Sequence, residues 1–380
     1  MMSRQRTWVC IVVCVGQLAC SPRPTLFGQR LNDADSARAE NDTTPQIQAL
    51  DAAFRAAQTE NEKAEALYRK AHALLDEHDD GQGIAILFRV ALAYPRSNRA
   101  ARAWLDLGRA YDKQGEAQRA EACYLELLGR HPSSGSTTAA AQRVADLRAE
   151  RGEPAHVTYG KLQAQTSDAT LRATLLYFEA AALQPSDPDG ARRKFEALIA
   201  ACPLPKGAYS DEAQLRIALL LRAANKPQEA LKQLAHLQKY DRSAAYVGSY
   251  TRQSYLDSYL LGAQILRDDL AQFDAARDLL QRALKRHSQS AIVDDIYFEL
   301  LLIELRQTRD TCDAFAKLLR VTPQSKYRRC AALLCASSSA PTGQPDLDAS
   351  SSRRCHDWLQ HGSPLRTPMR TSNFTHKGAP

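Results

Sequence analysis

The stretch from Trp104 to Pro132, WLDLGRAYDKQGEAQRAEACYLELLGRHP, decides the fold. Its bulky apolar residues recur every three or four positions on both sides of the polar segment 113–116, which predicts two amphipathic helices joined by a turn. Small residues at Gly108 and Ala120 let two helices cross closely, and Pro132 ends the second helix. The bulky packing residues are Trp104, Leu107, Tyr111 and Tyr124.

The same spacing recurs elsewhere in the chain. Copies of the second helix contain Ala191, Phe195 and Pro203, then Ala230, then Ala276 and Ala283; an earlier copy covers 67–95 and a weaker one 315–323. A period in the thirties is the signature of a repeat array, here of about six units. Since 380 residues exceed what one core usually organises, the predicted fold class is an all-α solenoid of antiparallel helix pairs.

The stretch from Trp104 to Pro132 resembles the tetratricopeptide repeat. The junctions at 94–97, 131–134 and 322–325 share Pro followed two residues later by Ser, which we expect to cap the next helix. These junctions resemble those of envelope repeat proteins, namely the BamD-type lipoprotein of outer-membrane β-barrel assembly and the periplasmic repeat protein associated with Tol-Pal. The resemblance implies a non-enzymatic scaffold that binds protein or peptide partners in cell-envelope or outer-membrane assembly.

The N-terminus has the pattern of an export signal. Arg4 and Arg6 precede an apolar run, 8–15, that is too short to span a bilayer. The run leads to Leu18-Ala19-Cys20, which resembles the lipobox of bacterial lipoproteins. This implies lipidation at Cys20, membrane contact through that anchor only, and a location on the periplasmic side of the outer membrane. Without lipid the protein would be periplasmic or secreted.

Composition shifts predict the domain organisation. Breaks in the apolar pattern coincide with polar segments and with Gly and Pro residues. The expected parts are a signal peptide at 1–20, a flexible linker at 21–45, an N-terminal repeat array at 46–148, an interrupting loop at 149–169, a C-terminal array at 170–336 and a disordered tail at 337–380.

In repeat arrays of this kind the first helix of each pair lines a groove that takes up an extended peptide or a helix. Arginine, aromatic and aliphatic residues at those places suit a peptide with acidic groups. The alternative interpretation is an ordinary solvated helix face. The candidate groove residues are Tyr68, His72, Arg102, Leu105, Arg109, Leu215, Leu219 and Arg222.

The cysteines outside the signal region offer several pairings in an oxidising compartment. We expect a disulfide from Cys312 to Cys330 or Cys335, which would clamp the C-terminal helices. Cys123 lies beside Tyr124 and is expected to act as a small buried apolar residue.

The sequence contains no pattern that indicates catalysis, a metal site or a cofactor, so we predict a protein that is not an enzyme. The 50 Lys and Arg exceed the 43 Asp and Glu by +7 and are spread along the chain, which does not indicate nucleic-acid binding. Two alternatives remain. One is a soluble periplasmic oligomerisation or binding module. The other is an accessory subunit of an envelope enzyme that uses His156, Tyr159 and Lys161, or His356 in the tail.

Overall fold

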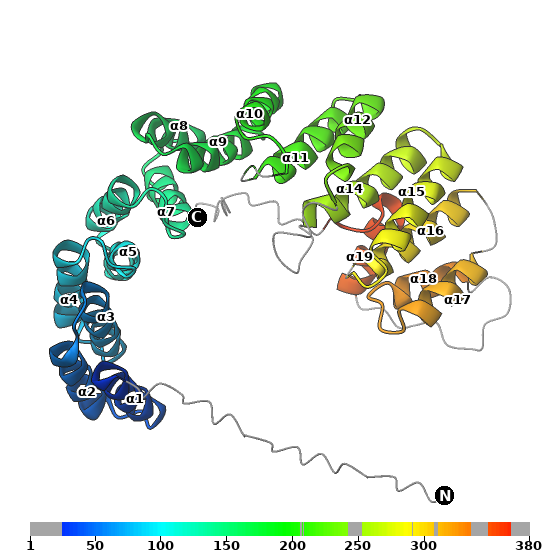
Figure 1. Cartoon of the computed structure of the whole chain (residues 1–380). Coiled ribbons are helices and arrows are strands. Elements are labelled where there is room, and N and C mark those ends of the chain that lie inside the picture. Colours follow the sequence, from blue (N-terminus) through cyan, green and yellow to red (C-terminus); the bar gives the residue numbers. More distant parts are fainter. Residues whose placement is uncertain are drawn as a thin grey trace, which may run out of the picture. The chain divides into compact units, whose positions relative to one another are not determined.

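A computed structural model describes residues 25–205, 207, 209–241, 253–290, 292–307, 311–335 and 349–365. Every regular element within these ranges is a helix, and the helices follow one another as antiparallel pairs in a solenoid of tetratricopeptide type, as predicted (Figure 1). The chain divides into two compact units, Met1–Glu116 and Ala117–Pro380.

The first unit contains α1 (Leu26–Ala39), α2 (Thr43–Ala56), α3 (Glu60–Asp76), α4 (Asp80–Ala93) and α5 (Ala100–Lys113). The second unit contains α6 (Ala117–Arg130), α7 (Thr137–Ala149), α8 (Ala155–Gln165), α9 (Ala169–Leu183), α10 (Pro188–Ala201), α11 (Ser210–Ala223), α12 (Pro227–Gln238), α14 (Gln253–Gln264), the π-helix η2 (Ile265–Asp269), α15 (Phe273–Arg286), α16 (Val293–Arg306), α17 (Cys312–Val321), α18 (Arg328–Cys335) and α19 (Ala349–His361).

A left-handed residue ends the first helix of several pairs. His78, Gly115, Gly152 and Asn225 have φ of 62°, 75°, 87° and 58°. Gly152 lies three residues after α7, and each of the others directly follows the cap residue of its helix. Backbone hydrogen bonds close the last turn there, for example from the Asp79 N–H to the carbonyl of Leu74 at 2.9 Å. This arrangement satisfies the terminal carbonyls of one helix and reverses the chain toward the next.

The prediction of a flexible linker at 21–45 is wrong for its described part. Helix α1 begins after Thr25, whose hydroxyl accepts a hydrogen bond from the Gly28 N–H at 3.1 Å, and it packs against α2. Its buried residues are the small Ala34 and Ala37. Because α1 packs through alanines, it lacks the bulky apolar periodicity by which a helix is recognised in a sequence.

The predicted interrupting loop at 149–169 contains a helix as well. Gly152 is in the left-handed conformation in the turn that follows α7, and Pro154 is the N-cap of α8. Tyr159 of α8 is 1% exposed and stacks on Phe178 of α9 with ring centroids 5.5 Å apart. The glycine and the proline that were expected to break the array instead form one of its turns.

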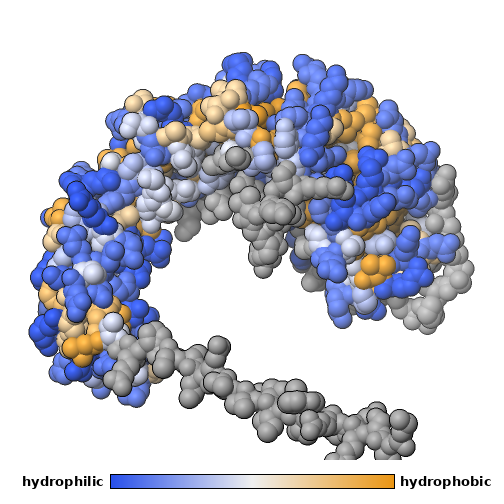
Figure 2. All heavy atoms as spheres, in the orientation of Figure 1, coloured by the Kyte–Doolittle hydropathy of each residue, from blue (hydrophilic) through white to orange (hydrophobic). Residues whose placement is uncertain are grey.

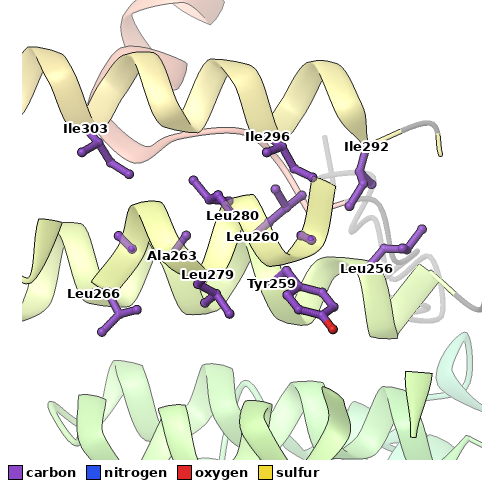
Figure 3. Packing of buried hydrophobic residues seen from close by; sticks show 12 residues of the cluster. Leu256, Tyr259, Leu260, Ala263, Leu266, Leu279, Leu280, Ile292, Ile296 and Ile303 are labelled. Carbon is purple, nitrogen blue, oxygen red and sulfur yellow. The ribbon is translucent and has the colours of Figure 1, made fainter. Parts of the chain in front are cut away.

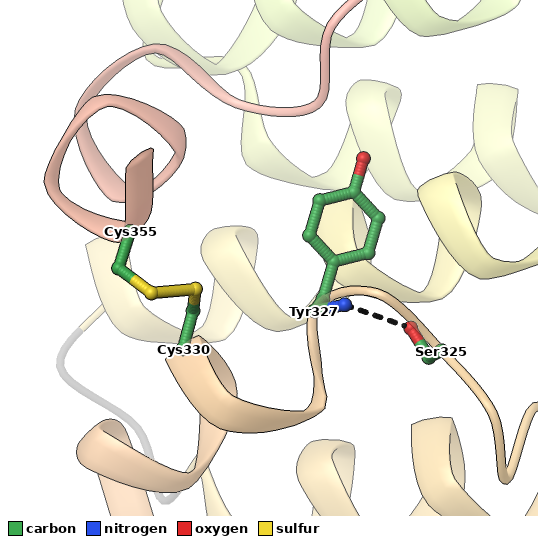
Figure 4. Close-up of a disulfide and its surroundings, with 4 residues drawn as sticks. All are labelled: Ser325, Tyr327, Cys330 and Cys355. Carbon is green, nitrogen blue, oxygen red and sulfur yellow. Dashed lines mark hydrogen bonds between the residues drawn. A yellow bond between two sulfur atoms is a disulfide. The ribbon is translucent and has the colours of Figure 1, made fainter. Parts of the chain in front are cut away.

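The predicted disordered tail at 337–380 is ordered from 349 to 365. A disulfide joins Cys355 of α19 to Cys330 of α18, so Cys330 does not pair with Cys312 as one expectation had it (Figure 4). Cys312 is itself disulfide-bonded, and the side chain of Cys335 lies outside the described residues. Trp358 packs edge-on against Tyr327 at 4.9 Å. The disulfide and this aromatic contact order a polar segment that has little apolar surface of its own.

The expectation for Cys123 is confirmed, and the expectation for the junction serines is wrong. Cys123 is free and 4% exposed, as expected, and burial followed by the nearby Glu126 raises the pKa of its thiol to about 11. The junction serines do not cap the helices. Ser325 accepts a hydrogen bond from the Tyr327 N–H at 3.2 Å, in the turn before α18, because the chain makes an extra turn before the helix begins (Figure 4).

The core runs along the facing sides of successive helices. In the second unit, Leu260 of α14, Leu280 of α15 and Ile296 of α16 are fully buried and point toward one another (Figure 3). Most of the predicted packing residues are buried; they are Trp104, Leu107, Gly108, Tyr111, Ala120, Tyr124, Ala191, Phe195, Ala230, Ala276 and Ala283. Pro132 is half-buried and Pro203 is exposed, both just after a helix.

Polar side chains cover much of the visible surface (Figure 2). Among the described helices, none has the length and apolarity that crossing a membrane requires.

Candidate functional site

Four predicted groove residues of the first unit meet at one carboxylate. Asp106 of α5 is 7% exposed and accepts a hydrogen bond from the Tyr68 hydroxyl of α3 at 2.5 Å. His72 Nε2 lies 3.2 Å from the same Asp106 oxygen, and Arg109 donates to the other oxygen at 3.2 Å. Arg102 Nε is 3.9 Å away. The helix register brings these side chains together because α3 and α5 are the first helices of neighbouring pairs.

The electrostatics of the cluster favour an ionised Asp106. Burial by itself would raise the pKa of this carboxyl, but hydrogen bonds from His72 and Tyr68 outweigh burial and lower the pKa below its usual value. Burial, and then the bond to Asp106, raise the pKa of the Tyr68 phenol. The structure therefore contains a buried anion that fixes the orientation of the basic groups around it.

A second group of charges lies next to this cluster. Glu65 accepts hydrogen bonds from Arg69 Nε at 2.7 Å and from Arg99 Nη2 at 3.0 Å, and Arg69 also donates to Asp35 of α1 at 2.9 Å. Burial opposes ionisation of Glu65, yet the two arginines lower its pKa. These residues surround a cavity of about 480 Å³, lined in part by Asp35, Arg38, Glu65, Tyr68, Arg69, His72 and Arg99.

The outer part of the Asp106 cluster is open to solvent. The side chains of Arg102 and Arg109 are each 55% exposed, and that of His72 is 41% exposed. A guanidinium group has five N–H donors in a planar fork, so two half-exposed arginines can still donate to a further acceptor. We define the Asp106 site as Tyr68, His72, Arg102, Asp106 and Arg109.

The other predicted groove residues do not join this site. Leu105 and Leu215 are 3% and 0% exposed and belong to the core, so neither offers a surface to a partner. Leu219 of α11 is half-buried. Arg222 donates to Asp269 of η2 at 2.7 Å and 3.1 Å. Leu105 lies on α5 and Leu215 on α11, and both helices have apolar residues on more than one face. Position in the sequence alone therefore assigned these two leucines to the wrong face of the helix.

The sequence analysis missed Asp106, the carboxylate that the other members of the site surround. A signal was present: Glu65 pairs with Arg99 and His72 with Asp106, and both pairs are 34 residues apart. Opposite charges one repeat apart on successive first helices are expected to meet, as positions three or four apart do within one helix.

The residues of the enzyme alternative have structural contacts instead. Tyr159 belongs to the core, and Lys161 donates to Glu153 at 3.1 Å. His156 is half-buried and His356 is exposed. Within the described residues, no group of three or more His, Cys, Asp or Glu side chains is placed to hold a metal ion.

Comparisons with known proteins give one family match and several similar solved structures. Residues 102–134 match the tetratricopeptide repeat family. No curated protein matches the chain. A tetratricopeptide repeat protein from Parabacteroides merdae is similar with a TM-score of 0.32 and 14% identity, over 73% of this chain and 98% of that one. The apo form of the quorum sensor NprR from B. thuringiensis has a TM-score of 0.43 and 12% identity, over 88% and 97%. The TPR2AB domain of yeast Sti1, solved in complex with pHSP90, has a TM-score of 0.28 and 14% identity, over 77% and 98%.

The family match covers the stretch from Trp104 to Pro132 by which the repeat was predicted. The chain thus contains a tetratricopeptide repeat within an all-helical solenoid. Its assignment to the BamD-type or Tol-Pal-associated proteins stays a prediction.

Proposed function

We propose that this protein is an interaction scaffold whose Asp106 site binds an extended protein segment that carries carboxylates. A helical repeat array has no single enclosed centre for chemistry but has a long surface for a partner. One observation carries the proposal: the Asp106 carboxylate is 7% exposed and lies 3.9 Å from Arg102 and 3.2 Å from Arg109, whose side chains are 55% exposed.

The charge distribution favours an acidic segment over a basic one. Asp106 is enclosed by Tyr68, His72 and the two arginines, so its charge is shielded from the surface while theirs faces solvent. Charge-assisted hydrogen bonds from arginine to a carboxylate are among the stronger polar contacts. The adjoining cavity of about 480 Å³ gives room for a neighbouring side chain of the partner.

For its location we propose the cell envelope, with a lipid on Cys20 and a role in outer-membrane or envelope assembly. The support is sequence-based: the basic start, the apolar run and the Leu18-Ala19-Cys20 motif. Cys20 lies outside the described residues. The alternative is a soluble periplasmic binding module with the same Asp106 site.

Binding can be tested on the full chain with a set of fluorescent extended peptides that differ in the number of Asp and Glu residues. We expect acidic peptides to bind the wild type and to bind Arg102→Glu/Arg109→Glu at least about tenfold more weakly. Arg55→Glu, at an exposed position of α2, is the matched control and should bind as the wild type does. Equal binding by the two charge-reversed proteins would contradict the proposal.

The location has a separate test that does not depend on binding. The intact mass of protein from the membranes of a Gram-negative host should fit cleavage before Cys20 plus acyl chains, and Cys20→Ser should move the protein to the soluble fraction. An unlipidated mass with unchanged fractionation of Cys20→Ser would favour the soluble module.

A further inference from the structure

Near the C-terminus, Gly362 and Ser363 leave α19 and run between the first helices of two neighbouring pairs. The Ser363 N–H and hydroxyl donate to Glu299 of α16 at 2.6 Å and 2.7 Å. Its carbonyl accepts from Gln264 Nε2 of α14 at 2.8 Å. Side chains of the helices therefore satisfy every polar group of Ser363, main chain included.

The groups that hold Ser363 form a network with one another. Gln264 donates to Glu299 at 2.8 Å, and Arg267 of η2 pairs with Glu299. The side chains of Arg267 and Glu299 are 1% and 0% exposed. A buried ion pair of this kind holds its polar atoms in fixed positions. These contacts join α14, η2 and α16 to one another without involving residues 362–365.

The site also contacts residues on either side of Ser363. Gly362 has φ of +90°, and a Cβ added to it would lie 2.5 Å from Glu299 Oε1, so the site accepts no side chain there. Leu365 packs against the apolar cluster that contains Leu260 and Ile296. Since Ser363 donates to Glu299 and Leu365 contacts this cluster, both side chains face the helices. The pattern that fits is Gly-Ser-x-Leu.

The segment is held in place through α19. The Cys330–Cys355 disulfide anchors that helix (Figure 4), and Arg306 of α16 donates to the carbonyl of Gln360 at its end at 3.1 Å. Binding of 362–365 is therefore intramolecular, which corresponds to a high effective concentration of ligand.

We propose that Gln264, Arg267 and Glu299 form a second peptide-recognition site, that residues 362–365 occupy it as an internal ligand, and that a Gly-Ser-x-Leu segment of a partner protein replaces them. All recognised groups come from four consecutive residues, so a segment of another chain can present the same groups. This site is distinct from the Asp106 site, because it binds main-chain groups, a hydroxyl and an apolar side chain, whereas the Asp106 site is proposed to bind acidic groups.

The test uses the full chain and a fluorescein-labelled peptide Gln-His-Gly-Ser-Pro-Leu, the sequence of 360–365. Gly362→Val should expel the internal segment without changing the helices that form the site. We expect fluorescence anisotropy to show the probe binding to this variant at least about tenfold more tightly than to the wild type, in which the internal segment competes. Gly152→Val is the matched control: Gly152 also has positive φ, at +87°, but nothing lies within 4 Å of an added Cβ. It should bind the probe as the wild type does.

Two further measurements separate recognition from simple capping of the fold. Adding Gln264→Leu to Gly362→Val should abolish the gain, and a probe with Ala in place of Ser should bind more weakly. If Gly362→Val loses its helical circular dichroism, Ser363→Ala takes its place, since it removes one hydrogen bond from the internal segment and should still raise probe binding above that of the wild type. A folded Gly362→Val or Ser363→Ala protein that binds the probe no better than the wild type overturns the proposal.

Discussion

The Asp106 site of the first unit can be compared with the Glu299 site of the second, which consists of Gln264, Arg267 and Glu299. Both contain a buried carboxylate with hydrogen-bond donors around it, but the first is open to solvent and the second is filled by the chain itself. Each has a buried carboxylate on the first helix of a pair, with donors from the preceding first helix. The arginines come from α5 itself at Asp106 and from η2 at Glu299. Around Asp106 the basic groups are half-exposed, with side chains 55% exposed at Arg102 and Arg109. Around Glu299, Arg267 is 1% exposed and the chain's own Ser363 fills the remaining hydrogen bonds.

The difference shows what a buried carboxylate does in this fold. In both sites the anion orients donors that a helix surface would otherwise leave mobile. What distinguishes the sites is what surrounds them. The arginines at Asp106 are half-exposed to solvent, whereas at Glu299 an internal segment donates to the carboxylate through the Ser363 N–H and hydroxyl and accepts from Gln264 through the Ser363 carbonyl. The loss in free energy of unfolding when each carboxylate is replaced should increase with the burial of that carboxylate. The predictions below are ordered by the size of this loss.

The largest effect is expected at Glu299. Glu299→Ala leaves Arg267, Gln264 and the Ser363 N–H without their shared acceptor, and removing one partner of a buried pair costs about 3–5 kcal/mol. Glu304→Gln on the same helix is the control, because the Glu304 side chain is 22% exposed and its pair with Arg277 is worth at most about 1 kcal/mol. Urea unfolding followed by circular dichroism measures both. Equal stabilities of the two variants would show that the Glu299 network contributes little.

A smaller effect is expected at Asp106. Asp106→Ala leaves the Tyr68 hydroxyl without its acceptor in a buried position, at a cost of about 1–3 kcal/mol. Asp33→Ala is the control, since its pair with Arg30 is solvent-exposed on both sides and should contribute almost nothing. The same unfolding measurement applies. If Asp106→Ala were as stable as Asp33→Ala, the donors around Asp106 would not depend on it.

The Asp106 site should also make the first unit sensitive to acid. The folded-state pKa of Asp106 is lowered below its usual 3.8, so the unfolded chain binds the proton more tightly. Its contribution to stability is therefore fully present above the usual pKa and is lost as the pH falls through the folded value. Between about pH 5 and pH 2, the free energy of unfolding of the wild type should fall more steeply than that of Asp106→Asn. Parallel pH profiles for the two proteins would contradict the assigned ionisation.

The repeat spacing allowed the fold to be predicted, because small residues at helix crossings and bulky ones between them leave a periodic trace. Ala191, Phe195 and Ala230 are fully buried and were found by that trace. Helices α1 and α19 were not found. The first packs through Ala34 and Ala37, and the second is ordered by a disulfide whose partner, Cys330, no local pattern identifies.

The candidate sites were predicted in part. Tyr68, His72, Arg102 and Arg109 were selected from their places on the first helices, and they do gather around one carboxylate. Their shared partner Asp106 was missed, because a carboxylate in the sequence of an amphipathic helix is expected to face solvent. Only the position of the neighbouring helix shows that it is buried. The Glu299 site could not be found from local sequence, since Ser363 is 64 residues from Glu299.

The smallest effect on stability, and the clearest on function, is expected at Arg102. Its Nε lies 3.9 Å from Asp106 and its side chain is 55% exposed, so Arg102→Ala should change the free energy of unfolding by no more than about 0.5 kcal/mol. Binding of an acidic peptide should nevertheless weaken, and the salt dependence of the remaining affinity should be shallower than that of the wild type, because one exposed positive charge is gone. Isothermal titration at two salt concentrations measures both quantities. A variant that lost stability and kept its binding would reverse the assignment and make Arg102 a structural partner of Asp106.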